Sequence, residues 1–125
     1  MNFTHTEAAP QAVGPYSQAV EIAGFVYTSG QVGLDPTSQT LVEGGFDAQA
    51  RQVMKNLEAV LDAAGCSFDD VVKSTIYVTD MGNFAILNQI YAEAMGDHRP
   101  ARSTVEVSAL PVGALVEIDM VARVR

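Results

Sequence analysis

The sequence predicts an α+β fold in two layers, a mixed six-stranded β-sheet with two helices on one face. Two segments have the apolar spacing of amphipathic helices, and the other patterned segments alternate with period two. A helix that follows a strand implies a crossover and some parallel pairing, whereas strands near the ends of the chain can form hairpins. At 125 residues the chain has the usual size of one domain, so residues 1–125 are expected to form a single unit.

Five strands can each be assigned to a segment of the sequence by its alternating pattern. Near the N-terminus, QAVEIAGFVYTSGQ (residues 18–31) is typical of two strands joined by a turn at Ala23-Gly24. Three further strands are predicted in VVKSTIYVTD (71–80), RSTVEVSA (102–109) and LVEIDMVARV (115–124).

Two amphipathic helices are predicted between these strands. The first runs from Asp47, which is expected to cap its start, to Gly65, which is expected to end it. The second covers about residues 83–96. Its apolar residues form one stripe: Phe84, Leu87, Ile90, Tyr91, Ala94 and Met95.

Each of the last three predicted strands separates an apolar set from a polar set. Val72, Ile76 and Val78 are expected to face the helices. The opposite face is expected to carry the polar sets: Lys73, Thr75, Tyr77, Arg102, Thr104, Glu106, Glu117 and Asp119. Scattered charges are ordinary on a face that meets water. Phe25, Tyr27 and Val121 are also expected there, which favours a subunit interface with polar pockets.

Charge and composition narrow the function classes. The chain has 15 acidic and 7 basic residues, a net charge of −8 that repels nucleic acid and anionic lipid surfaces. No apolar run approaches the roughly 20 residues that span a bilayer, and no signal peptide is recognised, so a cytoplasmic protein is expected.

Cys66 is expected to be a small buried residue. The isolated His5 and His98 indicate no metal site.

The stretch RPARSTVEV places Arg102 near the start of a strand, two residues after the stiff Pro100. Arg102 and Glu117 belong to the polar sets of the last two strands, so they are expected to lie close together if these strands pair. A fixed guanidinium can bind a carboxylate through two parallel hydrogen bonds. The alternative is a structural salt bridge from Arg102 to Glu106 or Glu117.

Six segments in order along the chain resemble the RidA family, also called YjgF/YER057c/UK114. They are VGPYSQAV, VYTSGQVG, AQARQVMKNLEAVLDAAG, VVKSTIYVTDMGNFAILNQIY, RPARSTVEV and LVEIDMVA. The resemblance covers nearly the whole chain, and the pairing of PARS with the later VEI is its most specific part. It implies a chorismate-mutase-like fold that assembles as a homotrimer, with ligand clefts between subunits.

The resemblance also implies roles for individual residues. Arg102 would bind the substrate carboxylate, and Glu117 would orient or activate the attacking water. Tyr16, Ser29 and Gly30 would line the cleft. Asn88 matches an asparagine at the edge of the site; its alternative role is as a helix cap or a satisfied polar group beside the core. Ser103, whose backbone could bind ligand, stands where many members have cysteine.

The activity implied for such a site is hydrolytic deamination of 2-imino and 2-enamino acids, such as 2-aminoacrylate, 2-iminopropanoate and 2-iminobutanoate, to 2-oxo acids and ammonia. No metal or organic cofactor is expected for this chemistry. Two alternatives stay open: a non-catalytic trimer that binds small 2-oxo acids, and an endoribonuclease or translation inhibitor, which the negative charge disfavours. Arg99 and a short link between Tyr91 and Pro100 depart from the family pattern, and they bear on which imine is preferred.

Overall fold

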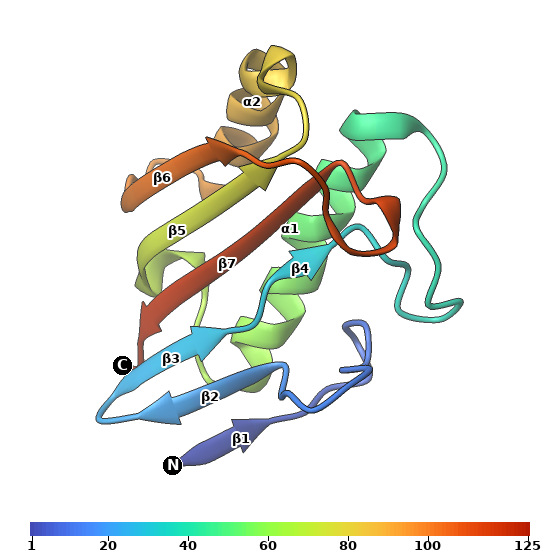
Figure 1. Ribbon diagram of the computed structural model, residues 1–125. Coiled ribbons are helices and arrows are strands. Elements are labelled where there is room, and N and C mark those ends of the chain that lie inside the picture. The colour runs from blue at the N-terminus through green and yellow to red at the C-terminus, as the bar shows by residue number, and fades with distance from the viewer.

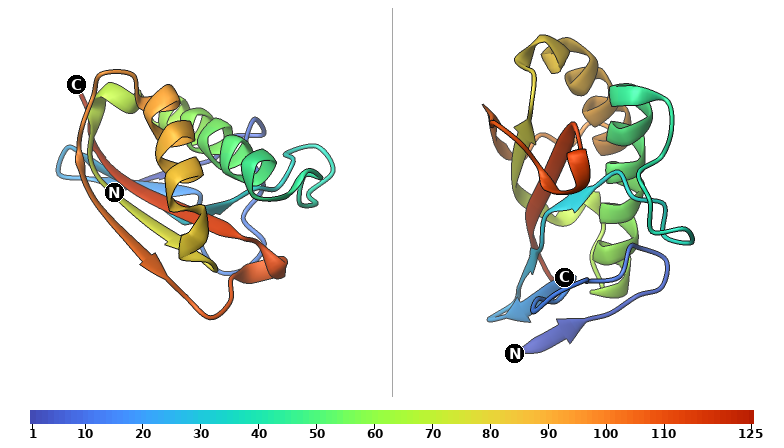
Figure 2. Two further views of the ribbon diagram at one scale, coloured as in Figure 1. Left: turned by 90° about the horizontal axis from the view of Figure 1, so that it is seen from above. Right: turned by 45° about the vertical axis from the view of Figure 1, so that its right-hand side comes forward.

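The computed structural model describes all 125 residues, and it contains one mixed sheet with two helices packed on the same face (Figures 1 and 2). Along the sheet the strands follow the order β1-β2-β3-β7-β5-β6, and β4 also pairs with β7. Only β5 and β6 are parallel. The predicted mixed sheet and two-helix layer are therefore confirmed. The element bounds are β1 Asn2–Thr4, β2 Ala19–Ile22, β3 Phe25–Thr28, β4 Gln31–Val32, α1 Gly45–Ala63, β5 Val71–Val78, α2 Phe84–Met95, β6 Ala101–Glu106 and β7 Val116–Arg123.

The predicted strand number is wrong, because the sheet has seven strands instead of six. The strands β1 and β4 have only three and two residues. Strands this short do not produce a recognisable alternation in the sequence. The predicted hairpin is confirmed: β2 and β3 are antiparallel, and Ala23 and Gly24 join them with φ values of 53° and 82°. Two consecutive positive φ values are typical of the tight turn that matches strand twist.

The end of α1 follows the prediction more closely than its start. The helix begins at Gly45, and no side chain caps it. The Asp47 carboxylate instead accepts a hydrogen bond from Arg51 Nε at 2.8 Å, so its predicted capping role is wrong. After the helix, Gly65 has φ 82°, and Cys66 N–H donates to the Leu61 carbonyl at 2.8 Å. This is a glycine-terminated helix end, as predicted.

The core lies between the helix layer and the sheet. Fully buried side chains from α1 and α2, such as Leu57, Leu61 and Leu87, pack with Ile118 and Met120 of β7. Cys66 is buried in the same cluster, as predicted. Neither helix is long and apolar enough to cross a membrane.

A register shift at the start of β5 changes which valine is buried. Val71 pairs with Ala122 and Lys73 pairs with Val121, so Val72 is an extra residue on β5. Val71 is 1% exposed and Val72 is 43% exposed, which makes the predicted core position of Val72 wrong. A bulge of this kind re-aims one side chain without ending the strand.

The predicted face of strand β6 is also wrong. Arg102, Thr104 and Glu106 pair with Ser74, Ile76 and Val78 of β5, all of which are buried on the helix side. Paired residues point to the same side of a sheet, so these three β6 side chains face the helix layer. Because β6 is an edge strand on which Arg102 and Thr104 are only half-buried, polar residues are tolerated there. The strand β6 pairs with β5 and not with β7.

The face without helices, called the open face below, is rich in exposed apolar side chains. Strand pairing places Tyr27 opposite Val121 and Phe25 opposite Arg123, which confirms that Phe25, Tyr27 and Val121 share this face. Other members of the open face follow from the same pairing: Phe3, Val20, Ile22, Thr75, Tyr77, Ser103, Val105, Glu117 and Asp119.

Gly33 sets the distance between β4 and α1. A Cβ atom at Gly33 would lie 2.8 Å from the Cα of Gln49 and 2.9 Å from its carbonyl oxygen. We therefore expect Gly33→Ala to lower the free energy of unfolding by about 1–3 kcal/mol, the usual cost of overpacking. Urea unfolding at one fixed protein concentration measures the effect. Gly30→Ala is the matched control, because its Cβ would meet only the flexible Glu117 side chain. Equal stability of the two variants would contradict the prediction.

Candidate functional site

Arg102 is held against one stripe of α2. Its Nη2 donates to Asn88 Oδ1 at 2.7 Å. The guanidinium carbon also lies 5.1 Å from the ring centre of Tyr91 and 5.6 Å from that of Phe84. Residues 84, 88 and 91 are spaced by about one helical turn, so they present a continuous surface to the strand below. The predicted site residues Asn88 and Arg102 are therefore in direct contact.

Arg102 has no carboxylate partner in the chain. The three ion pairs are Arg51–Asp47, Arg51–Glu93 and Arg125–Asp70. The alternative salt bridge from Arg102 to Glu106 or Glu117 is not formed, and Glu106 instead accepts a hydrogen bond from the Met81 N–H at 2.8 Å. A half-buried guanidinium with one of its five N–H donors in use can bind an anion bidentately.

Glu117 lies on the open face of β7, where it pairs with Tyr77 of β5 and Val32 of β4. Its carboxylate packs directly against Gly30, because a Cβ added at Gly30 would clash with Glu117 Oε2. Burial, and secondly the charge of Asp119, raise the pKa of Glu117 above the usual glutamate range. A half-buried carboxyl with a raised pKa is suited to proton transfer near neutral pH.

Asp119 and Tyr77 are neighbours of Glu117 that the sequence assigned to the polar face but not to the site. Burial raises the pKa of Asp119, and a hydrogen bond from the Tyr77 hydroxyl partly offsets this rise. Burial, followed by the charge of Asp119, likewise raises the pKa of Tyr77. Glu117 and Asp119 are two residues apart on one strand face, and that spacing was the available signal for a carboxylate pair.

Gly30 lies against the Glu117 side chain, and Ser29 directly precedes Gly30 in the chain. The Ser29 N–H donates to the Gln18 carbonyl at 2.9 Å, and its hydroxyl donates to the Ser17 carbonyl at 2.5 Å. These bonds join the loop that carries Tyr16 to the two-residue link between β3 and β4, which consists of Ser29 and Gly30. Tyr16 itself is 53% exposed. Of these predicted site residues, Gly30 contacts Glu117, and Ser29 is bonded to the residue that follows Tyr16.

Arg102 and Glu117 were expected to lie close together if their strands paired, and this condition is not met because β6 does not pair with β7. Strand β5 separates their strands, and the register aligns Arg102 with Ser74 but Glu117 with Tyr77. Ser74 and Tyr77 are an odd number of residues apart, so they point to opposite faces. Arg102 therefore lies on the helix side and Glu117 on the open face. Ser103, the next residue on β6, is exposed on the open face.

Arg99 is directed to the end of α2. Its Nη1 donates to the carbonyls of Gly96 and His98, in the link between α2 and β6. A cation at this position satisfies carbonyl groups that a helix end leaves free. Arg99 is thus bound to backbone carbonyls, whereas Arg102 is bound to the side chains of α2.

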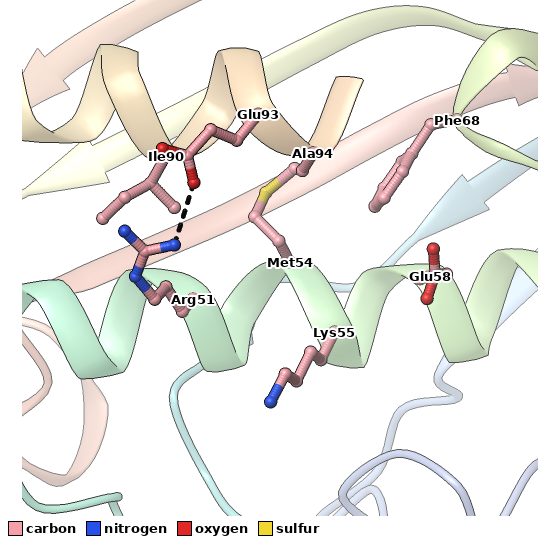
Figure 3. Close-up of a pocket in the computed structure, with 8 residues that line it drawn as sticks. All are labelled: Arg51, Met54, Lys55, Glu58, Phe68, Ile90, Glu93 and Ala94. Carbon is pink, nitrogen blue, oxygen red and sulfur yellow. Dashed lines mark hydrogen bonds and ion pairs between the residues drawn. The ribbon is translucent and has the colours of Figure 1, made fainter. Parts of the chain in front are cut away.

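The groove between α1 and α2 contains none of the predicted site residues. It has a volume of about 300 Å³, and its apolar floor includes Met54, Ile90 and Ala94 (Figure 3). At its rim Arg51 of α1 forms an ion pair with Glu93 of α2 at 3.0 Å. This groove is the seam along which the two helices pack.

The raised pKa of Glu117 predicts a specific pH dependence of stability. The folded chain binds this proton more tightly than the unfolded chain, so stability falls as pH rises from the ordinary glutamate pKa of about 4.3 through the raised folded-state value. We expect Glu117→Gln to remove part of this fall. The free energy of unfolding of the variant minus that of the parent should therefore be larger at pH 7.5 than at pH 4. Urea unfolding at both pH values and one protein concentration tests this. Parallel pH profiles for parent and variant would contradict it.

The chain is similar to known proteins over nearly its whole length. A family model described as Endoribonuclease L-PSP matches residues 6–124. Mouse 2-iminobutanoate/2-iminopropanoate deaminase is 50% identical over 117 residues, which cover 94% of this chain and 87% of that protein.

Two solved structures show the same arrangement. RidA from the Antarctic bacterium Psychrobacter is 45% identical with a TM-score of 0.96, covering 99% of this chain and 100% of that one. E. coli TdcF with bound serine is 34% identical with a TM-score of 0.93, and the match covers both chains completely. The predicted resemblance is confirmed, and the chain belongs to the RidA (YjgF/YER057c/UK114) family.

Proposed function

We propose that the protein is a hydrolytic deaminase of 2-imino and 2-enamino acids. The observation that carries this proposal is the Arg102 guanidinium, which is held by Asn88 and two aromatic rings but has no acidic partner. Such a group is suited to bind the carboxylate that every substrate of this class carries. The name of the mouse relative, a 2-iminobutanoate/2-iminopropanoate deaminase, supports the same chemistry.

In this proposal the reaction begins with a 2-iminium carboxylate bound to Arg102, and an enamine such as 2-aminoacrylate enters as its imine tautomer. Glu117 accepts a proton from water as the water oxygen bonds to the C2 carbon, and the C=N double bond becomes a C–N single bond. Glu117 then returns the proton to the amine nitrogen. The C–N bond breaks, ammonia leaves with its electron pair, and the remaining hydroxyl proton is lost to give the 2-oxo acid. Positioning and a proton acceptor supply the catalysis.

The opposite faces of Arg102 and Glu117 require a second chain to complete this site. We propose a homotrimer in which the open faces meet, as in the chorismate-mutase-like assembly that the family resemblance implied, with each site formed where the edge strand β6 of one subunit brings Arg102 to Glu117 of the next. The open face supports this assembly, because Phe3 is 70% exposed and Tyr27 is 46% exposed on it. Apolar patches of this kind mark interfaces in soluble proteins.

Tyr16, Ser29 and Gly30 would line the same cleft beside Glu117, and the exposed Ser103 would contribute backbone groups next to Arg102. The cleft then combines one cation, one carboxylate and small polar groups, without a metal. It would accept short carboxylic acids with a polar substituent at C2. The serine bound in the E. coli relative TdcF belongs to this chemical class.

A second candidate function is non-catalytic binding of small 2-oxo acids. Arg102 would serve binding and catalysis equally well, and the serine in TdcF shows that a relative holds a small amino acid. The two functions differ in Glu117, which a binder does not require as a proton acceptor. Glu117→Gln would abolish turnover in a deaminase but leave 2-oxobutanoate affinity nearly unchanged.

Removing the Arg102 guanidinium should weaken catalysis strongly. We expect Arg102→Ala to lower kcat/KM for 2-iminobutanoate hydrolysis roughly a hundredfold, since losing one partner of a charge pair typically costs about 2–5 kcal/mol. The assay couples an amino acid oxidase, which produces the imine, to detection of 2-oxo acid and ammonia. Arg99→Ala is the matched control and should retain activity within about threefold, because Arg99 binds only backbone carbonyls. Full activity of Arg102→Ala would refute the proposed carboxylate anchor.

The proposed assembly predicts a mass of three chains in solution. Sedimentation velocity of the parent should give a trimer, and Tyr27→Asp should shift it to smaller species, because the charge would be buried in the open-face contact. Ile86→Asp is the control: Ile86 is 43% exposed on α2, outside the open face, so its variant should stay trimeric. A monomeric parent, or a trimeric Tyr27→Asp, would contradict the assembly.

A further inference from the structure

Ser74 is a polar residue in an apolar part of the core. It is fully buried on the helix side of β5, in a strand whose other buried side chains there are Val71, Ile76 and Val78. Its hydroxyl has one side-chain partner, the Tyr91 hydroxyl of α2, at 2.8 Å. A buried hydroxyl is costly without a hydrogen bond, so this pair fixes Tyr91 to one point on the sheet.

The same tyrosine reaches the neighbouring strand. Ser74 and Arg102 are register partners on β5 and β6, so they stand side by side on one face of the sheet. Tyr91 bonds to the first and places its ring 5.1 Å from the guanidinium carbon of the second. Tyr91 is only 6% exposed, so its ring is shielded from solvent. Its position is defined by a hydrogen bond, and its ring in turn restricts Arg102.

We propose that Tyr91, anchored by Ser74, is a positioning residue that orients the Arg102 fork toward its ligand. The inference rests on the proposed function in one respect, that Arg102 binds the carboxylate. Asn88 occupies one N–H of the guanidinium, and the Tyr91 ring limits rotation of its plane. The remaining N–H groups then keep a constant direction, which a bidentate carboxylate contact requires.

Four variants separate this role from a general contribution to the core. Tyr91→Leu removes ring and hydroxyl, Tyr91→Phe keeps the ring, Ser74→Ala removes the anchor, and Ile90→Val is a mild core change in the same helix. We expect Tyr91→Leu to weaken 2-oxobutanoate binding, measured by calorimetry, about tenfold, within the range of a partly desolvated cation–π contact. Tyr91→Phe and Ser74→Ala should each weaken it by about twofold to fourfold. Ile90→Val should leave it unchanged.

Turnover gives a second readout. Tyr91→Leu should raise KM for the imine about as much as it weakens 2-oxo acid binding, and kcat should fall less than threefold, because an orienting contact acts on both bound states. An unchanged affinity in Tyr91→Leu, or an equal loss in Ile90→Val, would overturn the proposal. If Tyr91→Leu does not fold, as judged by circular dichroism, the Tyr91→Phe and Ser74→Ala affinities decide the matter: values equal to the parent refute the positioning role.

Nuclear magnetic resonance of the Arg102 Nε–H group tests the positioning without any ligand. Its ¹⁵N relaxation should report a rigid side chain in the parent and Ile90→Val, and a mobile one in Tyr91→Leu. If the parent neither turns over imine nor binds 2-oxobutanoate but Tyr91→Leu still loosens Arg102, the proposed function fails while the positioning stands. If Arg102 is equally rigid in all variants, the positioning fails even where the deaminase activity is confirmed.

Discussion

The register of β5 with its two neighbours determines the sheet face on which Arg102, Ser103 and Glu117 lie. Side chains alternate along a strand, so pairing Arg102 with Ser74 sends the arginine to the helix side. Pairing Glu117 with Tyr77 sends the glutamate to the open face. A slip of one residue in the β5–β6 pairing would move Arg102 to the open face, and one in the β5–β7 pairing would move Glu117 to the helix side. Burial opposes a slip of β7, because Val116, Ile118 and Met120 are fully buried on the helix side and would be moved to the open face.

The sequence predicted those parts of the fold whose burial follows a regular period. The two helices, the hairpin at Ala23-Gly24 and the inward set of β7 were identified because each has a core on one side only. The strand β6 was misassigned because it lies at an edge. There the helix-facing positions hold Arg102 and Thr104, and an outward position holds Val105, so polarity no longer reports the face. The bulge at Val72 involves no change of pattern that the sequence reveals.

The candidate site was predicted as a set of residues but not as a geometry. Motif resemblance identified Asn88, Arg102 and Glu117, and the contact between Asn88 and Arg102 is present. The division of the set between two faces depends on which strands are neighbours, and the sequence does not contain that information. Asp119 and Tyr77 were visible only as members of a polar face. Burial raises the pKa of the Glu117 and Asp119 carboxyl groups, and the charge of Asp119 raises that of Glu117 further.

The open face is mainly apolar, yet it carries two carboxyl groups of raised pKa. Association of chains through this face would therefore change the environment of these carboxyl groups. Covering this face would remove more water from Glu117 and Asp119, which would favour their protonated forms further unless a cation approaches. Arg102 cannot be that cation within its own chain, because it lies on the other side of the sheet. In a contact between chains, the arginine of one subunit could approach the glutamate of another with the substrate carboxylate between them. In the proposed assembly, the two charged groups are apart in the single chain and would meet opposite ends of one small ligand only between subunits.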